Sequence, residues 1–70
     1  MNTYTVVLSW DSEAAIWRAS NDDIPINLES ESIDKLMERV KLATPELLEL
    51  NNKDTRCTLH FIAEREEEVA

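Results

Sequence analysis

The main constraint on this chain is its length, because 70 residues can bury only one hydrophobic core. A domain of this size buries about 60% of the surface that its unfolded chain exposes, so a deep substrate cavity would remove side chains that stability requires. We therefore expect residues 1–70 to form a single domain. Any functional site is expected on a surface, a sheet edge or a subunit interface.

The charge is strongly unbalanced, with 15 Asp and Glu residues against 7 Lys and Arg residues, for a formal net charge of −8. Such a field repels nucleic-acid phosphates and attracts cationic surfaces, so we expect no direct nucleic-acid binding and a small basic protein as partner. The alternative is that the excess acid only maintains solubility. A lone Cys57 and the lack of an apolar run of about 20 residues predict a cytoplasmic protein rather than a disulfide-bonded or membrane protein.

Two neighbouring segments alternate between apolar and polar residues, as β-strands do. In residues 4–10 the members of one face are Tyr4, Val6, Leu8 and Trp10, and in residues 15–20 they are Ala15, Trp17 and Ala19. Polar residues 11–13 between them favour a turn, which predicts an antiparallel hairpin. Because the chain contains no glycine, positive φ angles are expected on Asn or Asp, as at Asn21, Asp22 and Asp23.

After Pro25 the pattern predicts a short third strand from Ile26 to Glu29, followed by a helix that Ser32 caps. The apolar residues with helical spacing are Ile33, Leu36, Met37 and Val40. Since Pro45 cannot donate a helical hydrogen bond, we expect a kink or break near Ala43 and a short second helical segment to Leu50.

Alternation returns from Arg56 to Ala63, which predicts a last strand with Cys57, Leu59, Phe61 and Ala63 on one face. The acidic residues 64–70 are expected to form a solvated, flexible tail. The predicted fold is therefore α+β, with a three-stranded antiparallel meander, one helix and a returning fourth strand. A bare strand edge or the sheet's only partly apolar second face would gain from being covered, so we also expect the chain to form a homodimer.

Much of the chain, roughly Tyr4 to Phe61, resembles the HicB-like antitoxin family, and more closely its short stand-alone bacterial branch. The segments that carry the resemblance are Tyr4-Thr5-Val6-Val7, Trp10-Asp11, residues 16–25, residues 31–36 and residues 44–51. The resemblance implies three strands and a returning strand around one helix, a truncated relative of the ribonuclease H fold that lacks its active site. It also implies a small basic ribonuclease toxin as the partner that the domain sequesters.

Two departures limit what the resemblance implies. The family usually has Pro-Gly after the second strand, whereas this chain has Pro25-Ile26. The sequence also ends before the helix-turn-helix or ribbon-helix-helix that many antitoxins use to bind an operator, so the resemblance does not extend to DNA binding.

Three groups of residues in the sequence are candidates for a chemical role. Cys57 and His60 are three residues apart in a predicted strand, so their side chains point to opposite faces and cannot form a nucleophile–base pair or share a metal. The pair Trp10 and Trp17 is expected to pack in the core rather than to form a stacking platform, because only Arg18 supplies a neighbouring cation.

The third group, Asp11, Glu13, Asp22 and Asp23, could collect around the sheet's loops, although turn chemistry explains most of it without a bound ion. We predict no catalytic residue, no metal and no cofactor. The expected function is a non-catalytic, antitoxin-like protein-binding module that meets its basic partner through these four carboxylates. The alternative is a stand-alone homodimeric structural or regulatory domain with no toxin partner.

Overall fold

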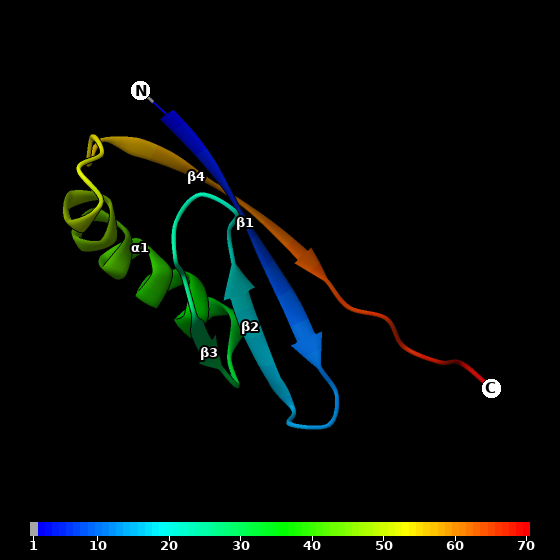
Figure 1. Cartoon of the computed structure of the whole chain (residues 1–70). Helices are drawn as coiled ribbons and strands as arrows, with labels where there is room; N and C mark the ends of the chain where they lie inside the picture. The colour runs from blue at the N-terminus through cyan, green and yellow to red at the C-terminus, as the bar shows by residue number, and fades with distance from the viewer. Residues whose placement is uncertain (1) are drawn as a thin grey trace.

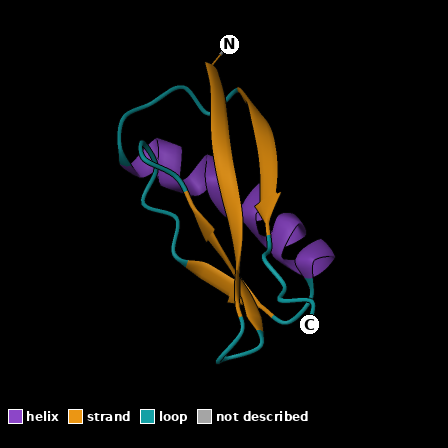
Figure 2. Cartoon of the chain, turned by 90° about the vertical axis from the view of Figure 1, so that its right-hand side faces the viewer, coloured by secondary structure: helices purple, strands orange, loops and turns teal. Residues whose placement is uncertain are grey.

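The structure, a computed structural model, describes residues 2–70 and consists of one sheet with one helix across it (Figure 1). In chain order the elements are β1 (Asn2–Asp11), β2 (Ile16–Ser20), β3 (Leu28–Ser30), α1 (Ile33–Leu50) and β4 (Cys57–Glu64). Figure 2 shows that α1 runs across one face of the sheet. The predicted α+β class and the order of the elements are confirmed, although β3 and β4 each begin one or two residues later than expected.

The four strands have the order β3-β2-β1-β4, so β1 and β2 are central and β3 and β4 form the edges. The pairs β1–β2 and β2–β3 are antiparallel, which confirms the predicted meander. The strand β4 is parallel to β1, with Leu59 opposite Tyr4 and Phe61 opposite Val6. The sheet is mixed because α1 carries the chain back to the end of the sheet where β1 begins, and parallel neighbours require such a crossover.

The core lies between α1 and the face of the sheet that the alternation predicted. Its buried apolar residues are Tyr4, Val6, Leu8, Ala19, Ile24, Ile26, Leu36, Val40 and Leu48. Ile24 and Ile26 belong to the loop before β3 rather than to a strand, and the backbone N–H of Ile26 donates to the carbonyl of Ile24 at 2.7 Å. The alternation predicted Ile26 as a core residue but missed Ile24.

The predicted break in the helix is wrong, because α1 is one 18-residue helix with Pro45 inside it. Ser32 is the N-cap, as expected, and its Oγ accepts from the backbone N–H of Lys35 at 3.3 Å. Thr44 does not cap a second helix. It is buried, and its Oγ1 donates to the carbonyl of Val40 at 2.6 Å, so packing on both sides of Pro45 holds the helix together. No helix in residues 2–70 is long and apolar enough to cross a membrane.

Positive φ angles fall at Ala15 (53°) and Asn52 (56°), not at Asn21, Asp22 or Asp23 as predicted. Ala15 closes the turn between β1 and β2. Asn52 follows the C-cap of α1. Its backbone N–H donates to the carbonyl of Glu49, and the N–H of Lys53 donates to the carbonyl of Leu48. These two hydrogen bonds are those of a Schellman motif. Asn takes the place of the usual glycine there, since it tolerates the left-handed region better than most residues.

Candidate functional site

The two tryptophans lie side by side at the end of the sheet near the β1–β2 turn. Trp10 and Trp17 are opposite each other on β1 and β2, with ring centroids 5.4 Å apart and planes tilted by 60°. The guanidinium carbon of Arg65 lies 4.0 Å from the ring centroid of Trp10 and 5.9 Å from that of Trp17. This is the geometry of a cation–π contact. Both tryptophans are half-buried, so the pair lies at the rim of the core.

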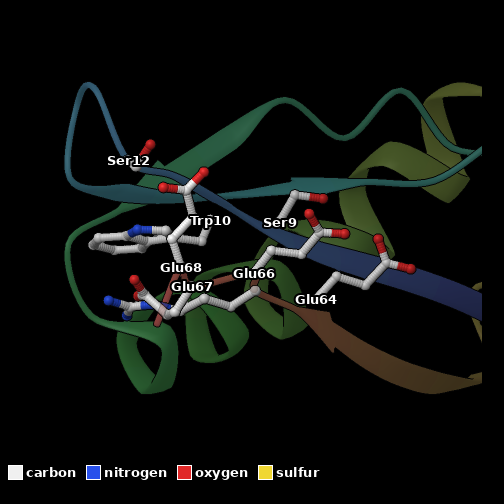
Figure 3. A pocket seen from close by; sticks show the side chains of 8 residues that line it. Ser9, Trp10, Ser12, Glu64, Glu66, Glu67 and Glu68 are labelled. Carbon is white, nitrogen blue, oxygen red and sulfur yellow. The ribbon is translucent and has the colours of Figure 1, made fainter. Parts of the chain in front are cut away.

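A hollow of about 680 Å³ opens beside this tryptophan pair (Figure 3). Its lining residues are Ser9, Trp10, Ser12, Glu64, Arg65, Glu66, Glu67 and Glu68. Arg65 also forms an ion pair with Glu67 at 2.6 Å, so the one cation of the hollow is neutralised within the tail. The sequence analysis missed Arg65 as a neighbour of Trp10, because the contact depends on β4 lying parallel to β1, with Glu64 opposite Ser9.

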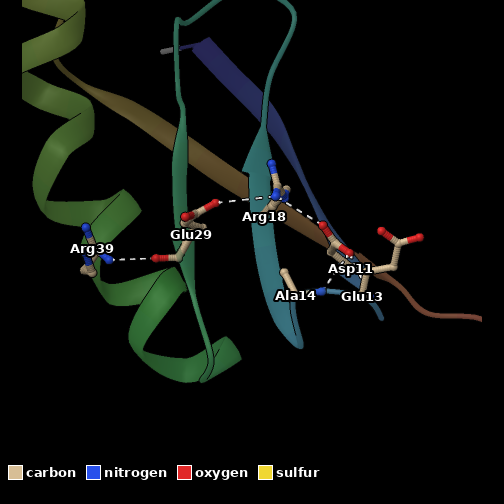
Figure 4. A network of polar contacts seen from close by, with 6 residues as sticks. All are labelled: Asp11, Glu13, Ala14, Arg18, Glu29 and Arg39. Carbon is tan, nitrogen blue, oxygen red and sulfur yellow. Dashed lines mark hydrogen bonds and ion pairs between the residues drawn. The ribbon is translucent and has the colours of Figure 1, made fainter.

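Asp11, the first of the four predicted partner-binding residues, has a structural role at the β1–β2 turn. Its Oδ1 accepts from the backbone N–H groups of Glu13 at 3.0 Å and Ala14 at 3.2 Å, and its Oδ2 lies 3.1 Å from Arg18 (Figure 4). The pKa of Asp11 is lowered, chiefly by the hydrogen bond from the Ala14 N–H. Desolvation opposes this effect, and the Glu13 N–H and Arg18 add smaller lowering effects. Asp11 therefore stays ionised to support the turn.

Arg18 extends this contact across the outer face of the sheet. It also lies 3.9 Å from the carboxylate of Glu29 on β3, whose carbonyl accepts from Nη1 of Arg39 on α1 at 2.8 Å (Figure 4). The network joins β1, β2, β3 and α1 and uses two of the chain's cations internally. Glu13, by contrast, is exposed and has no ion-pair partner among residues 2–70.

Asp22 and Asp23 lie at the other end of β2, in a loop that Asn21 organises. The Asn21 side chain donates to the carbonyl of Thr5 at 2.6 Å and accepts from the N–H groups of Asp23 and Ile24, both at 2.7 Å. The carboxylates of Asp22 and Asp23 are exposed, and neither forms an ion pair within the described chain. The turn interpretation holds for Asn21 rather than for the two aspartates.

The four predicted partner-binding residues therefore do not form one cluster. Asp11 and Glu13 are separated from Asp22 and Asp23 by the five residues of β2, a distance of about 17 Å at the usual rise of a strand. Within residues 2–70, no three His, Cys, Asp or Glu side chains are placed to hold a metal ion together.

Cys57 and His60 lie on opposite faces of β4, as the spacing predicted. Cys57 is half-buried and packs against the core, whereas His60 is exposed on the outer face and lies opposite Thr5 on β1. The two side chains cannot act on one substrate from these positions.

A second hollow, of about 330 Å³, is a groove between α1 and the inner side of β4. Its lining residues are Lys41, Thr44, Pro45, Thr55, Cys57, Leu59 and Phe61. The three residues from β4 point toward the core but are only half-buried, so the helix leaves this strand incompletely covered. The outer face of the sheet is not covered by any element of residues 2–70, and Val7, Ile16 and Ile62 lie on it.

Two comparisons with known proteins gave matches that cover almost the whole chain. A family model described as a domain of unknown function (DUF1902) matches residues 3–70. The chain is also similar to a solved structure, a hypothetical protein from the extremely thermophilic bacterium Thermus thermophilus. The two share 31% sequence identity and a TM-score of 0.82, over 97% of this chain and 100% of that one. No curated protein matched. The chain therefore belongs to the DUF1902 family.

Proposed function

We propose that this protein is a non-catalytic binding module of the cytoplasm, similar to a HicB antitoxin, that sequesters a small basic protein of the ribonuclease type. The observation that carries the proposal is the distribution of charge. Several basic side chains form ion pairs with the chain's own carboxylates, namely Arg18, Lys41, Arg56 and Arg65. Among residues 2–70, Glu13, Asp22 and Asp23 form no such pair and lie in exposed loops, where they remain available to a cationic surface.

The topology supports the same proposal. The HicB resemblance implies three strands, a helix and a returning strand, which is the element order β1-β2-β3-α1-β4. Cys57 and His60 lie on opposite faces of β4, so a binding role accounts better for their arrangement than a nucleophile–base pair does. Direct binding to nucleic acid is not part of the proposal, because a net charge of −8 opposes it.

The experiment is capture of partners from the native cytosol at low salt, followed by association kinetics of the purified pair. We expect a basic chain of about 60 to 90 residues whose ribonuclease activity falls when this protein is added. Association should slow as salt rises, because charges at the rim of an interface act mainly on the encounter rate.

The test variant is the double substitution Asp22→Lys and Asp23→Lys. Its control is the double substitution Glu46→Lys and Glu49→Lys. Both doubles change the net charge equally, and Glu46 and Glu49 are exposed on α1 without ion pairs in the described chain. The loop double should slow association more than the helix double. Equal effects, or an association rate that does not depend on salt, would show that the acidity serves only solubility.

A second candidate is a stand-alone homodimeric structural or regulatory domain with no toxin. The uncovered outer face favours it, since Val7 and Ile16 are half-buried there and Ile62 is 40% exposed. Failure to capture any basic protein, together with a stable dimer, would favour this candidate over the first.

A further inference from the structure

The strand β4 is the longer of the sheet's two edge strands. It has eight residues, and within residues 2–70 no strand pairs with its side away from β1. Long edge strands offer a row of main-chain donors and acceptors to another strand, and natural proteins commonly protect them with charges, prolines or bulges. Residues 57–63 of β4 contain no proline and no charged Asp, Glu, Lys or Arg.

The charge pattern indicates what kind of strand can approach. Residues 55–63 form a window without Asp or Glu in a chain that has 15 such residues. Two copies of so acidic a protein repel each other over most of their surface, and this window is a place where they can meet without facing carboxylates. The inner side of the window is also apolar, because Leu59 and Phe61 are half-buried beside the groove under α1.

We infer that β4 is a self-association edge, at which the β4 strands of two copies pair antiparallel about a two-fold axis at His60. Residues that lie opposite each other in an antiparallel pair point to the same face. In this register Leu59 lies opposite Phe61 of the second copy, and Cys57 lies opposite Ala63. The inner faces of the two sheets then join, and the half-buried side chains of β4 gain apolar neighbours.

The same register makes the charges complementary. Arg56, just before β4, lies opposite Glu64 of the second copy, and the symmetry produces this contact twice. The Arg56 side chain is 81% exposed, and its ion pair within residues 2–70 is with Asp54 at 3.4 Å, so it can reach across. A pairing centred on Leu59 would instead place Arg56 opposite Ile62, so Arg56 and Glu64 would not meet. A pairing centred on Phe61 would leave Glu64 opposite Thr58. The inference does not depend on a basic partner.

A charge-swap series in the full-length protein tests the inference. Arg56→Glu and Glu64→Arg each place like charges opposite each other at two symmetric positions, so each should weaken dimerisation by about tenfold. The double variant with both changes should recover the dissociation constant to within about threefold of the original protein. Sedimentation equilibrium measures the constants, and circular dichroism checks that each variant is folded. Lys53→Glu is the control, because it makes the same charge change in the neighbouring loop.

Cysteine cross-linking tests the register separately. In a Cys57→Ala background, His60→Cys should form a disulfide-linked dimer under mild oxidation, because directly opposite residues have Cα atoms about 4.5–5.5 Å apart. Thr5→Cys is the control, since Thr5 lies beside His60 on the same face but on the central strand β1. A monomer at high micromolar concentration would overturn the inference. A double charge variant no better than the singles, or cross-linking through Thr5→Cys as readily as through His60→Cys, would do so as well.

Discussion

The inner sides of β1 and β4 differ in burial although the two strands are neighbours and alternate in the same way. Tyr4, Val6 and Leu8 are at most 5% exposed, whereas Leu59 and Phe61, opposite Tyr4 and Val6, are only half-buried. The cause is the position of α1, whose main contacts are with β2 and β3. Strand alternation therefore determines which way a side chain points, but the placement of the helix determines how deeply it is buried.

The largest expected effect comes from the same truncation made on both strands. Leu8→Ala should lower the free energy of unfolding by about 3 kcal/mol, because it leaves a cavity in the covered core, and Leu59→Ala by only about 1 kcal/mol. Urea unfolding at low protein concentration measures both. Equal losses would mean that the inner side of β4 is as well packed as that of β1. If β4 pairs with a second copy, the effect of Leu59→Ala should increase with protein concentration.

Pro45 sits where α1 borders the groove beside β4. Pro45→Ala should raise the free energy of unfolding by about 2 kcal/mol, because alanine restores a backbone N–H and removes the steric conflict of proline inside a helix. Thermal or urea unfolding measures the change, and Glu46→Ala, at the next exposed helical position, should stay within about 0.5 kcal/mol. A loss of stability in Pro45→Ala would show that proline shapes the helix to fit the sheet.

Arg65 lies on Trp10 at the end of the sheet near the β1–β2 turn, and we expect it to contribute little to the free energy of unfolding. Arg65→Ala should cost about 0.5–1 kcal/mol and change the tryptophan fluorescence, because the guanidinium leaves the face of Trp10. Arg56→Ala removes an arginine that forms an ion pair with Asp54, and at low protein concentration it should leave the emission unchanged. Unchanged emission in Arg65→Ala would mean that the tail does not rest on the tryptophan pair in solution. The flexibility of residues 64–70 as a whole stays a prediction.

The smallest effect concerns pH at the β1–β2 turn. The pKa of Asp11 is lowered in the folded protein, so its contribution to stability is present above its unfolded value of 3.8 and is lost as pH falls through the lower, folded pKa. Melting temperatures measured from neutral pH down to pH values below 3.8 should therefore fall less steeply for Asp11→Asn than for the original protein. Equal slopes for the two proteins would mean that the Glu13 and Ala14 N–H groups and Arg18 do not stabilise the Asp11 carboxylate in solution.

Local patterns were sufficient for much of the fold. Alternation located β1, β2 and β4 and the faces of their side chains, and the spacing of Leu36 and Val40 together with Ser32 located the start of α1. These features depend on neighbours within a few residues, so the sequence contains all the information they need. The opposite-face placement of Cys57 and His60 followed from the same period of two.

Other features depended on residues far apart in the chain. Pro45 predicted a break, yet the burial of Thr44 and Leu48 against the sheet keeps α1 continuous. The chain has no glycine, and the tight connection between β1 and β2 has its positive φ angle at Ala15. Tertiary packing can offset the local backbone strain of such a residue.

By itself, the sequence determined the elements, their apolar faces and the net charge of −8, since each of these follows from composition or short-range periodicity. Only the tertiary structure decided that Arg65 lies on Trp10 and that β4 is a partly covered edge. The reason is that these two features depend on strand register and on the position of α1. Both are set by packing between segments that lie far apart in the chain.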